Sequence, residues 1–96
     1  MFNKQYKPIE CEDGFIMSVQ ACSRKYCSPR NDEGPYWAVE IGFPSRRESL
    51  LMDYAEDKTQ PTQTVYGWVP VTVMWEVITK HGGIRSGMLP PTRVCP

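Results

Sequence analysis

The chain has 96 residues, of which 41% are hydrophobic and 11% aromatic, and its 11 basic residues balance its 11 acidic residues. A chain of this length forms one globular domain and is too short for an active-site cleft between two domains. Zero net charge disfavours a DNA mimic or a general nucleic-acid coat, because both depend on a strong electrostatic field.

The chain carries no sequence signal for a membrane or a secretory route. No segment has the apolar core of a secretory signal or the length needed to cross a bilayer. We therefore expect a cytoplasmic protein with no membrane partner.

The expected cytoplasmic location determines the redox state predicted for the four cysteines. Cytoplasmic thiols normally stay reduced, so disulfides are not expected. Cys22 and Cys27 are separated by four residues, while Cys11 and Cys95 stand alone, so the paired CxxC spacing of a zinc site is missing. The sequence predicts small strand residues at Cys11 and Cys22, a loop thiol at Cys27, and neither a metal nor a cofactor.

The first half of the chain reads as strands joined by turns. A short strand at 9–11, a turn at Asp13-Gly14 and a strand at 15–22 form a hairpin, whose second strand alternates apolar with polar residues. Residues 23–35 are rich in turn formers and predict a long exposed loop, a type of segment that often carries function. Residues 36–43 alternate again and predict a third strand.

The second half predicts two helices and one more strand. Ser45 is expected to cap a short helix over 46–55, with Glu48 at capping-box distance. A strand at 63–69 leads into a helix that begins at Pro70 and ends at Gly82-Gly83.

The predicted fold is α+β, with an antiparallel sheet of about four strands covered by the C-terminal helix and one short additional helix. Residues 1–84 form the single domain. Residues 85–96 are rich in Gly and Pro and form a C-terminal arm or tail that either docks on a neighbour or remains mobile.

The sequence offers little support for catalysis. His81 is the only histidine, and its place at a helix C-terminus favours a structural role near the unpaired carbonyls. Gly82-Gly83 follows a helix, whereas a phosphate cradle needs glycines before one. We expect a protein that is not an enzyme.

The most informative feature is an exposed loop segment, 24–31, with three cations, one aromatic ring and no acid. Planar rings that stack a base, with guanidinium groups on phosphate, form a nucleotide site, and stacking is worth about 1–3 kcal/mol per base. The candidate phosphate ligands are Arg24, Lys25, Arg30, Arg46 and Arg47, and the candidate stacking residues are Tyr26, Tyr36, Tyr66 and Trp68. Tyr66 and Trp68 are expected to share a strand face. The competing interpretation has solubilising loop cations and a Trp68 in the core.

Trp75 is offset from the apolar face of the final helix and lies beside Glu76. Exposed tryptophan often marks an interface, so Trp75 is a candidate interface residue. A buried stripe wide enough to include it is the alternative.

Seven segments resemble a group of small phage- and prophage-encoded proteins with no assigned activity: DGFIMSVQA (13–21), YCSPR (26–30), GPY (34–36), VEIGFPS (39–45), YAED (54–57), TVYGWVP (64–70) and HGG (81–83). The resemblance extends to residue 84 and implies a setting, the cytoplasm of a bacterial host, but transfers no functional residue.

That setting implies a counter-defence protein that sequesters a small anionic ligand, namely a host immune-signalling nucleotide. In one form of this hypothesis the protein is a homo-oligomer that holds the ligand at the interface between its subunits. The alternatives are a protein–protein inhibitor of an immune effector such as a CRISPR complex, and an accessory structural protein of the phage.

Overall fold

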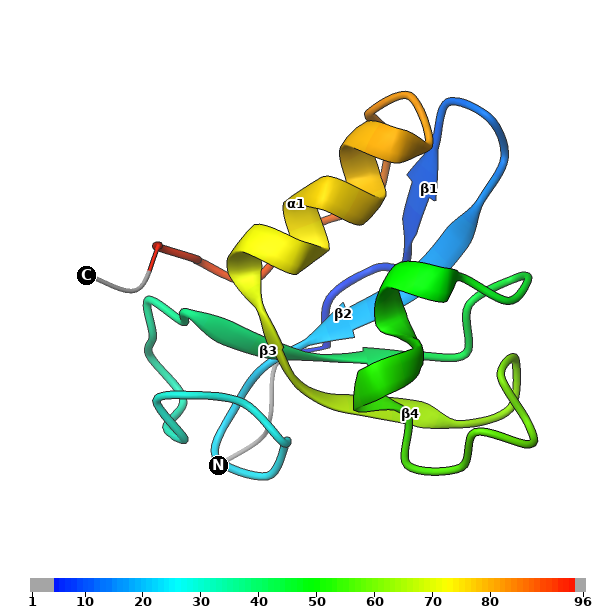
Figure 1. Cartoon of the computed structure of the whole chain (residues 1–96). Helices are drawn as coiled ribbons and strands as arrows, with labels where there is room; N and C mark the ends of the chain where they lie inside the picture. Colours follow the sequence, from blue (N-terminus) through cyan, green and yellow to red (C-terminus); the bar gives the residue numbers. More distant parts are fainter. Residues whose placement is uncertain (1–4, 95–96) are drawn as a thin grey trace.

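The structure is a computed structural model that describes residues 5–94 (Figure 1). Five strands form one antiparallel sheet in the order β4-β3-β2-β1-β5. The strands are β1 (Ile9–Cys11), β2 (Ile16–Gln20), β3 (Ala38–Gly42), β4 (Val65–Pro70) and β5 (Ile84–Ser86). A 3-10 helix, η1 (Ser49–Tyr54), precedes β4, and the α-helix α1 (Val71–Lys80) follows it directly. The predicted α+β fold is confirmed.

The core lies between the sheet and α1, which crosses one side of the sheet in Figure 1. The alternation of β2 and β3 places Met17, Val19, Val39 and Ile41 in this core without solvent exposure. The helix adds Val71, Met74, Val77 and Ile78. Each fully buried aliphatic side chain of this size contributes about 1.5–3 kcal/mol, so this apolar layer holds the helix on the sheet.

The end of α1 follows the prediction. Gly82 and Gly83 have φ values of 93° and 95°, in the left-handed region that glycine adopts most easily. The Gly83 N–H donates to the Ile78 carbonyl at 2.9 Å and the Gly82 N–H donates to Thr79 at 3.1 Å. The chain therefore turns away from the helix axis immediately after His81.

The short helix differs from the one predicted over 46–55. It is a 3-10 helix that begins at Ser49, and Glu48 is its N-cap, accepting the Leu50 N–H at 2.9 Å. Ser45 does not cap it, because its Oγ accepts the Ile16 N–H at 2.9 Å and its own N–H donates to the Ile16 carbonyl at 2.7 Å. The predicted Ser45 cap is wrong because a long-range contact with β2 uses that side chain.

The segment after α1 forms a strand that the sequence analysis did not predict. β5 pairs with β1, with Glu10 opposite Ser86 and Cys11 opposite Ile84. This pairing satisfies the outer edge of β1, a long-range gain that no local pattern reports.

The rest of the predicted arm docks on its own chain. The Arg93 N–H donates to the Tyr36 carbonyl and the Tyr36 N–H donates to the Pro91 carbonyl, both at 2.8 Å. The division at residue 84 stays a prediction, and residues 95–96 of the predicted tail lie outside the described residues.

Candidate functional site

The candidate site is built on a β-bulge in β4. Val69 pairs with Val39 and Tyr66 pairs with Ile41, so a single β3 residue, Glu40, faces the two intervening residues of β4. One extra residue changes the alternation of side chains along a strand. Tyr66 and Val69 therefore both lie in the core, which leaves Gly67 and Trp68 between them.

Trp68 is directed outward by this bulge. Its side chain is 49% exposed, and its φ of 49° lies in the left-handed region. A bulky residue rarely adopts that conformation, and such strained residues cluster at binding sites. The predicted shared face of Tyr66 and Trp68 is wrong, because a strict alternation does not include the bulge.

Two of the predicted stacking residues belong to the core. The ring of Tyr36 is buried, its hydroxyl donates to the Asn31 carbonyl at 2.8 Å, and burial raises the pKa of Tyr36 to about 12. Tyr66 is also buried, with its hydroxyl donating to the Pro61 carbonyl, and burial raises its pKa as well. Neither ring is available to a ligand.

Tyr26 brings the basic loop to the bulge. Its ring stacks on Trp68 with centroids 4.9 Å apart and planes at 29°. The Trp68 N–H donates to the Tyr26 carbonyl at 2.9 Å, and the Tyr26 N–H donates to Oε1 of Glu40 at 3.1 Å. The residue opposite the bulge thus anchors the loop that covers it, and we call the two exposed rings the Tyr26–Trp68 stack.

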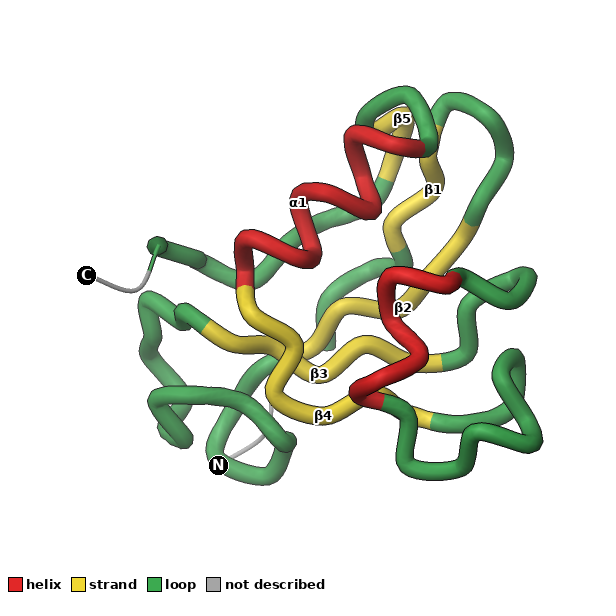
Figure 2. Tube along the Cα trace, in the orientation of Figure 1, coloured by secondary structure: helices red, strands yellow, loops and turns green. Residues whose placement is uncertain are grey.

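A pocket of about 340 Å³ opens beside this stack. Its lining residues are Tyr26, Tyr54, Glu56, Gly67 and Trp68. Two loops pair with the outer edge of β4 on either side of this cavity. The Tyr26 carbonyl accepts the Trp68 N–H, and the Glu56 N–H donates to the Val65 carbonyl, both at 2.9 Å. Figure 2 shows the two loops involved near opposite ends of β4. We call this cavity the aromatic pocket.

Gly67 lines the aromatic pocket, and its lack of a side chain matters there. A Cβ at this position would lie 3.2 Å from the Cβ of Tyr26, a contact tighter than normal van der Waals packing allows. Glycine therefore lets the backbone of β4 approach Tyr26 closely.

Charges of both signs surround the aromatic pocket. The guanidinium of Arg30 lies 5.7 Å from the centre of the Tyr26 ring, and its Nε donates to the Ser23 carbonyl at 3.2 Å. Arg24 and Lys25 belong to the same loop, whereas the one charged lining residue is the acid Glu56. The pocket therefore lies between a basic loop and a carboxylate.

The other predicted phosphate ligands do not join this group. Arg46 makes an ion pair with Asp13 at 3.0 Å and lies over the ring of Phe15, at 5.7 Å from its centre. Arg47 is exposed, and its charge acts on the hydroxyl of Tyr66. Neither arginine lines the aromatic pocket, so these two candidate phosphate ligands lie apart from it.

A second polar group surrounds His81 and was not foreseen in its details. Nδ1 of His81 lies 2.6 Å from Oδ2 of Asp13, and Nε2 lies 2.6 Å from Oε1 of Glu48. The imidazole is 5% exposed and stacks on Phe15 with centroids 4.1 Å apart, and Lys80 binds the second oxygen of Glu48 at 2.9 Å. We call Asp13, His81, Glu48 and Lys80 the carboxylate–histidine network.

The network has the character of a structural tie. Each ring nitrogen of His81 lies within hydrogen-bond distance of a carboxylate oxygen, so both nitrogens are already occupied. No nitrogen is left to activate a nucleophile, as Ser–His or Cys–His chemistry requires.

Hydrogen bonds also lower the pKa values of both acids in the network. Burial by itself would raise the pKa of Glu48, but hydrogen bonds from Lys80, the Leu50 N–H and His81 outweigh it and hold that pKa below its ordinary value. The pKa of Asp13 is lowered first by the Phe15 N–H and then by His81. Both carboxylates are therefore favoured in their charged forms.

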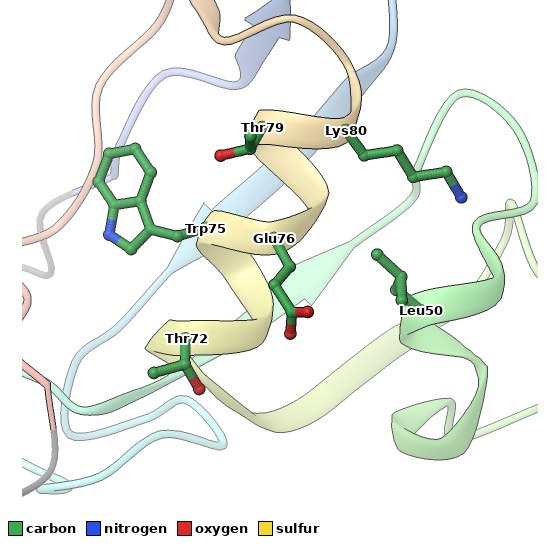
Figure 3. Close-up of a pocket in the computed structure, with 6 residues that line it drawn as sticks. All are labelled: Leu50, Thr72, Trp75, Glu76, Thr79 and Lys80. Atoms are coloured by element: carbon green, nitrogen blue, oxygen red, sulfur yellow. The ribbon is translucent and has the colours of Figure 1, made fainter.

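Trp75 lies on a separate surface of α1 and is 42% exposed, as one of the two interpretations predicted. An open groove of about 450 Å³ is lined by Leu50, Thr72, Trp75, Glu76, Thr79 and Lys80. Figure 3 shows the indole directed away from Leu50 and Lys80. Its role as an interface residue stays a prediction.

The cysteines Cys11, Cys22 and Cys27 are buried and free. Cys27 lies in a loop as predicted, but it is buried in the core, and its Sγ donates to the Cys22 carbonyl at 3.2 Å. The predicted strand position of Cys22 is wrong, because β2 ends at Gln20. Burial raises the pKa values of Cys11 and Cys27, which disfavours their reactive thiolates. Cys95 lies outside the described residues.

Within residues 5–94, no three His, Cys, Asp or Glu side chains are grouped as a metal site requires. In the same part of the chain, no helix combines the length and apolar character of a membrane span. Neither a protein-family model, nor a curated protein, nor a solved structure matches this chain.

Proposed function

We propose that this protein is a binding protein that holds a nucleotide on the Tyr26–Trp68 stack without catalysing a reaction. The observation that carries the proposal is the exposed Trp68 at a φ of 49°, stacked on the single aromatic residue of the basic loop. The exposed Trp68 ring contributes nothing to core packing, which supports a role for it in ligand binding.

The surroundings of the stack suit the two halves of a nucleotide. A cavity of about 340 Å³ falls within the usual size range of small-molecule sites, and its aromatic walls offer faces on which a base can stack. The loop that contains Tyr26 also carries Arg24, Lys25 and Arg30, whose guanidinium and ammonium groups can pair with phosphate.

The resemblance to phage-encoded proteins adds the biological setting. A small phage protein that binds a nucleotide without consuming it acts by sequestration, and the proposed ligand is then a host immune-signalling nucleotide. The proposed role is counter-defence in the cytoplasm of the infected bacterium.

The test is a titration of the purified protein with a panel of linear and cyclic nucleotides, followed by thermal unfolding. A ligand present at about a hundred times its Kd adds about 2.7 kcal/mol to the free energy of unfolding. We expect Trp68→Leu to weaken binding about 5- to 150-fold, since one stacked base contributes about 1–3 kcal/mol.

Trp75→Leu is the matched control, because it removes an exposed tryptophan from a different surface. It should bind the nucleotide like the wild type. Absence of binding by every nucleotide, or equal binding by the wild type and Trp68→Leu, would overturn the proposal.

A second candidate function is inhibition of an immune protein through the surface of α1. The exposure of Trp75 above an open groove favours it, because exposed tryptophan is frequent among residues that dominate binding energy. In that case Trp75→Ala abolishes inhibition while Trp68→Leu leaves it intact. The immune protein is first isolated by pull-down with this domain from infected cells. An inhibition assay against that protein with both variants then separates the two functions.

A further inference from the structure

The aromatic pocket contains one feature that stacking alone does not explain, the acid Glu56 in its wall. Tyr26, Tyr54 and Trp68 provide three rings around the cavity, and Glu56 is its only charged lining residue. If the pocket served only to stack any base, a carboxylate would add nothing.

The backbone of Glu56 is fixed close to the stack. Its N–H donates to the Val65 carbonyl at 2.9 Å, and the preceding Ala55 forms a bridge with Tyr66. These contacts hold Glu56 beside the β4 residues that flank Gly67.

The carboxylate of Glu56 has no partner of its own among residues 5–94. The salt bridges there involve Asp13 and Glu48, and no side-chain hydrogen bond reaches Glu56. The exposed carboxylate in this aromatic wall is therefore free to bind donors of a ligand.

We propose that Glu56 makes the aromatic pocket selective for guanine nucleotides, an inference that rests on the proposed nucleotide-binding function. Guanine presents two adjacent donors, N1–H and the N2 amino group, which match the two oxygens of one carboxylate. Bidentate pairing of this kind discriminates strongly between bases.

The other bases meet this carboxylate less well. Adenine and cytosine place a ring-nitrogen acceptor beside their single amino donor, and uracil flanks its N3–H with two carbonyl oxygens. Each of them directs at least one acceptor at the carboxylate, and acceptor-to-acceptor contact is repulsive. Hypoxanthine keeps N1–H but lacks the amino group, so it should rank between guanine and adenine.

The proposed contact with Glu56 also orients the rest of the nucleotide. With the Watson–Crick edge of the base toward Glu56 and its face on the Tyr26–Trp68 stack, the sugar and phosphate extend toward the loop of Arg24, Lys25 and Arg30. Glu56 then contacts the nucleobase at one end of the ligand, and the basic side chains of the loop contact the phosphate at the other end.

The test measures Kd by calorimetry for the 5′-monophosphates and 3′,5′-cyclic monophosphates of guanosine, inosine, adenosine, cytidine and uridine. We expect the guanine nucleotides to bind roughly 10-fold or more tightly than the adenine nucleotides, with inosine between them. Glu56→Gln should weaken guanine binding by about the same factor and should not weaken adenine binding, because the Gln amide offers adenine a donor in place of a repelling oxygen.

Glu76→Gln is the matched control, because Glu76 is an exposed acid in the separate groove on α1, and it should keep the guanine preference. Equal affinity for all bases, or a guanine preference that survives Glu56→Gln, would overturn this inference while leaving the proposed function intact. A complete lack of nucleotide binding would overturn both.

A quaternary ammonium probe provides one more decisive outcome. Aromatic rings with a carboxylate also suit an organic cation. Tetramethylammonium that binds the pocket more tightly than any guanine nucleotide, and loses this affinity in Glu56→Gln, would replace guanine with a cation as the ligand.

Discussion

At the scale of single residues, Glu48 is a buried acid whose carboxylate has three hydrogen-bonding partners. Its side chain is 2% exposed, yet it receives Lys80, His81 and the N–H of Leu50. Removing one partner of a buried ion pair costs several kcal/mol, because the remaining charge loses its compensation. The carboxylate of Glu48 therefore fixes the end of α1 to the start of η1.

We expect Glu48→Gln to lower the free energy of unfolding by about 3 kcal/mol, since His81 and Lys80 then face a neutral amide. Urea denaturation followed by circular dichroism measures this change. Glu76→Gln, an exposed substitution on α1, should stay within about 0.5 kcal/mol of the wild type. A similarly small effect of Glu48→Gln would contradict the assigned network.

The same residues show where sequence analysis reached its limit. His81 was correctly placed at the end of a helix from Gly82-Gly83, but its partners Asp13 and Glu48 lie 68 and 33 residues away in sequence. Local patterns carry no information on such pairs. The structural role predicted for His81 agrees with these contacts, but only the folded structure shows that the partners are Asp13 and Glu48.

The ligand site shows a comparable division. Tyr26, Arg30 and Trp68 were named from the sequence, and the structure brings them together. Tyr54 and Glu56 were missed because their approach to β4 depends on long-range contacts, the Ala55–Tyr66 bridge and the Glu56–Val65 hydrogen bond. The signal that could have found them is the carboxylate and ring pattern of 54–57, which precedes an aromatic strand.

At the scale of elements, the strands that alternate were predicted and the irregular ones were not. β2 and β3 carry a two-residue period and were placed within a few residues. β5 has three exposed residues and forms only through its pairing with β1. The bulge in β4 breaks the period itself, which is why Tyr66 was assigned to the wrong face.

The bulge yields a prediction for Gly67, whose Cβ would press on Tyr26 at 3.2 Å. We expect Gly67→Ala to displace Tyr26 from Trp68, lower the free energy of unfolding by about 1 kcal/mol and weaken nucleotide binding. Tryptophan fluorescence and calorimetry report the two effects.

Gly42→Ala is the control for this experiment, because a Cβ there meets Val65 at an ordinary 3.6 Å. It lies in the same sheet, on β3, and should leave the Tyr26–Trp68 stack and ligand affinity unchanged. Equal effects of the two substitutions would show that the close approach of Gly67 to Tyr26 has no special role.

At the scale of the whole molecule, the carboxylate–histidine network joins three parts of the fold. Asp13 belongs to the turn between β1 and β2, Glu48 begins η1, and His81 ends α1. Loss of this network removes the polar contacts of the end of α1 with the β1–β2 turn and with η1. Its protonation should therefore control the stability of the entire domain.

Acid should unfold the protein through Asp13 and Glu48, whose pKa values are lowered from ordinary values of 3.8 and 4.5. A lowered pKa means that the folded state binds its last proton less readily than the unfolded chain does. The stability contributed by each carboxylate is therefore fully present above its ordinary pKa and is lost as pH falls through the lowered one.

Thermal unfolding measured from pH 7 down to pH 2 tests this expectation. We expect a nearly constant melting temperature above about pH 5 and a progressive fall below it. Glu48→Gln starts from a lower melting temperature and should fall less steeply, because one of the two linked carboxylates no longer titrates. A wild-type melting temperature that rises on acidification, or an identical slope in the variant, would show that the network does not couple protonation to the stability of the domain.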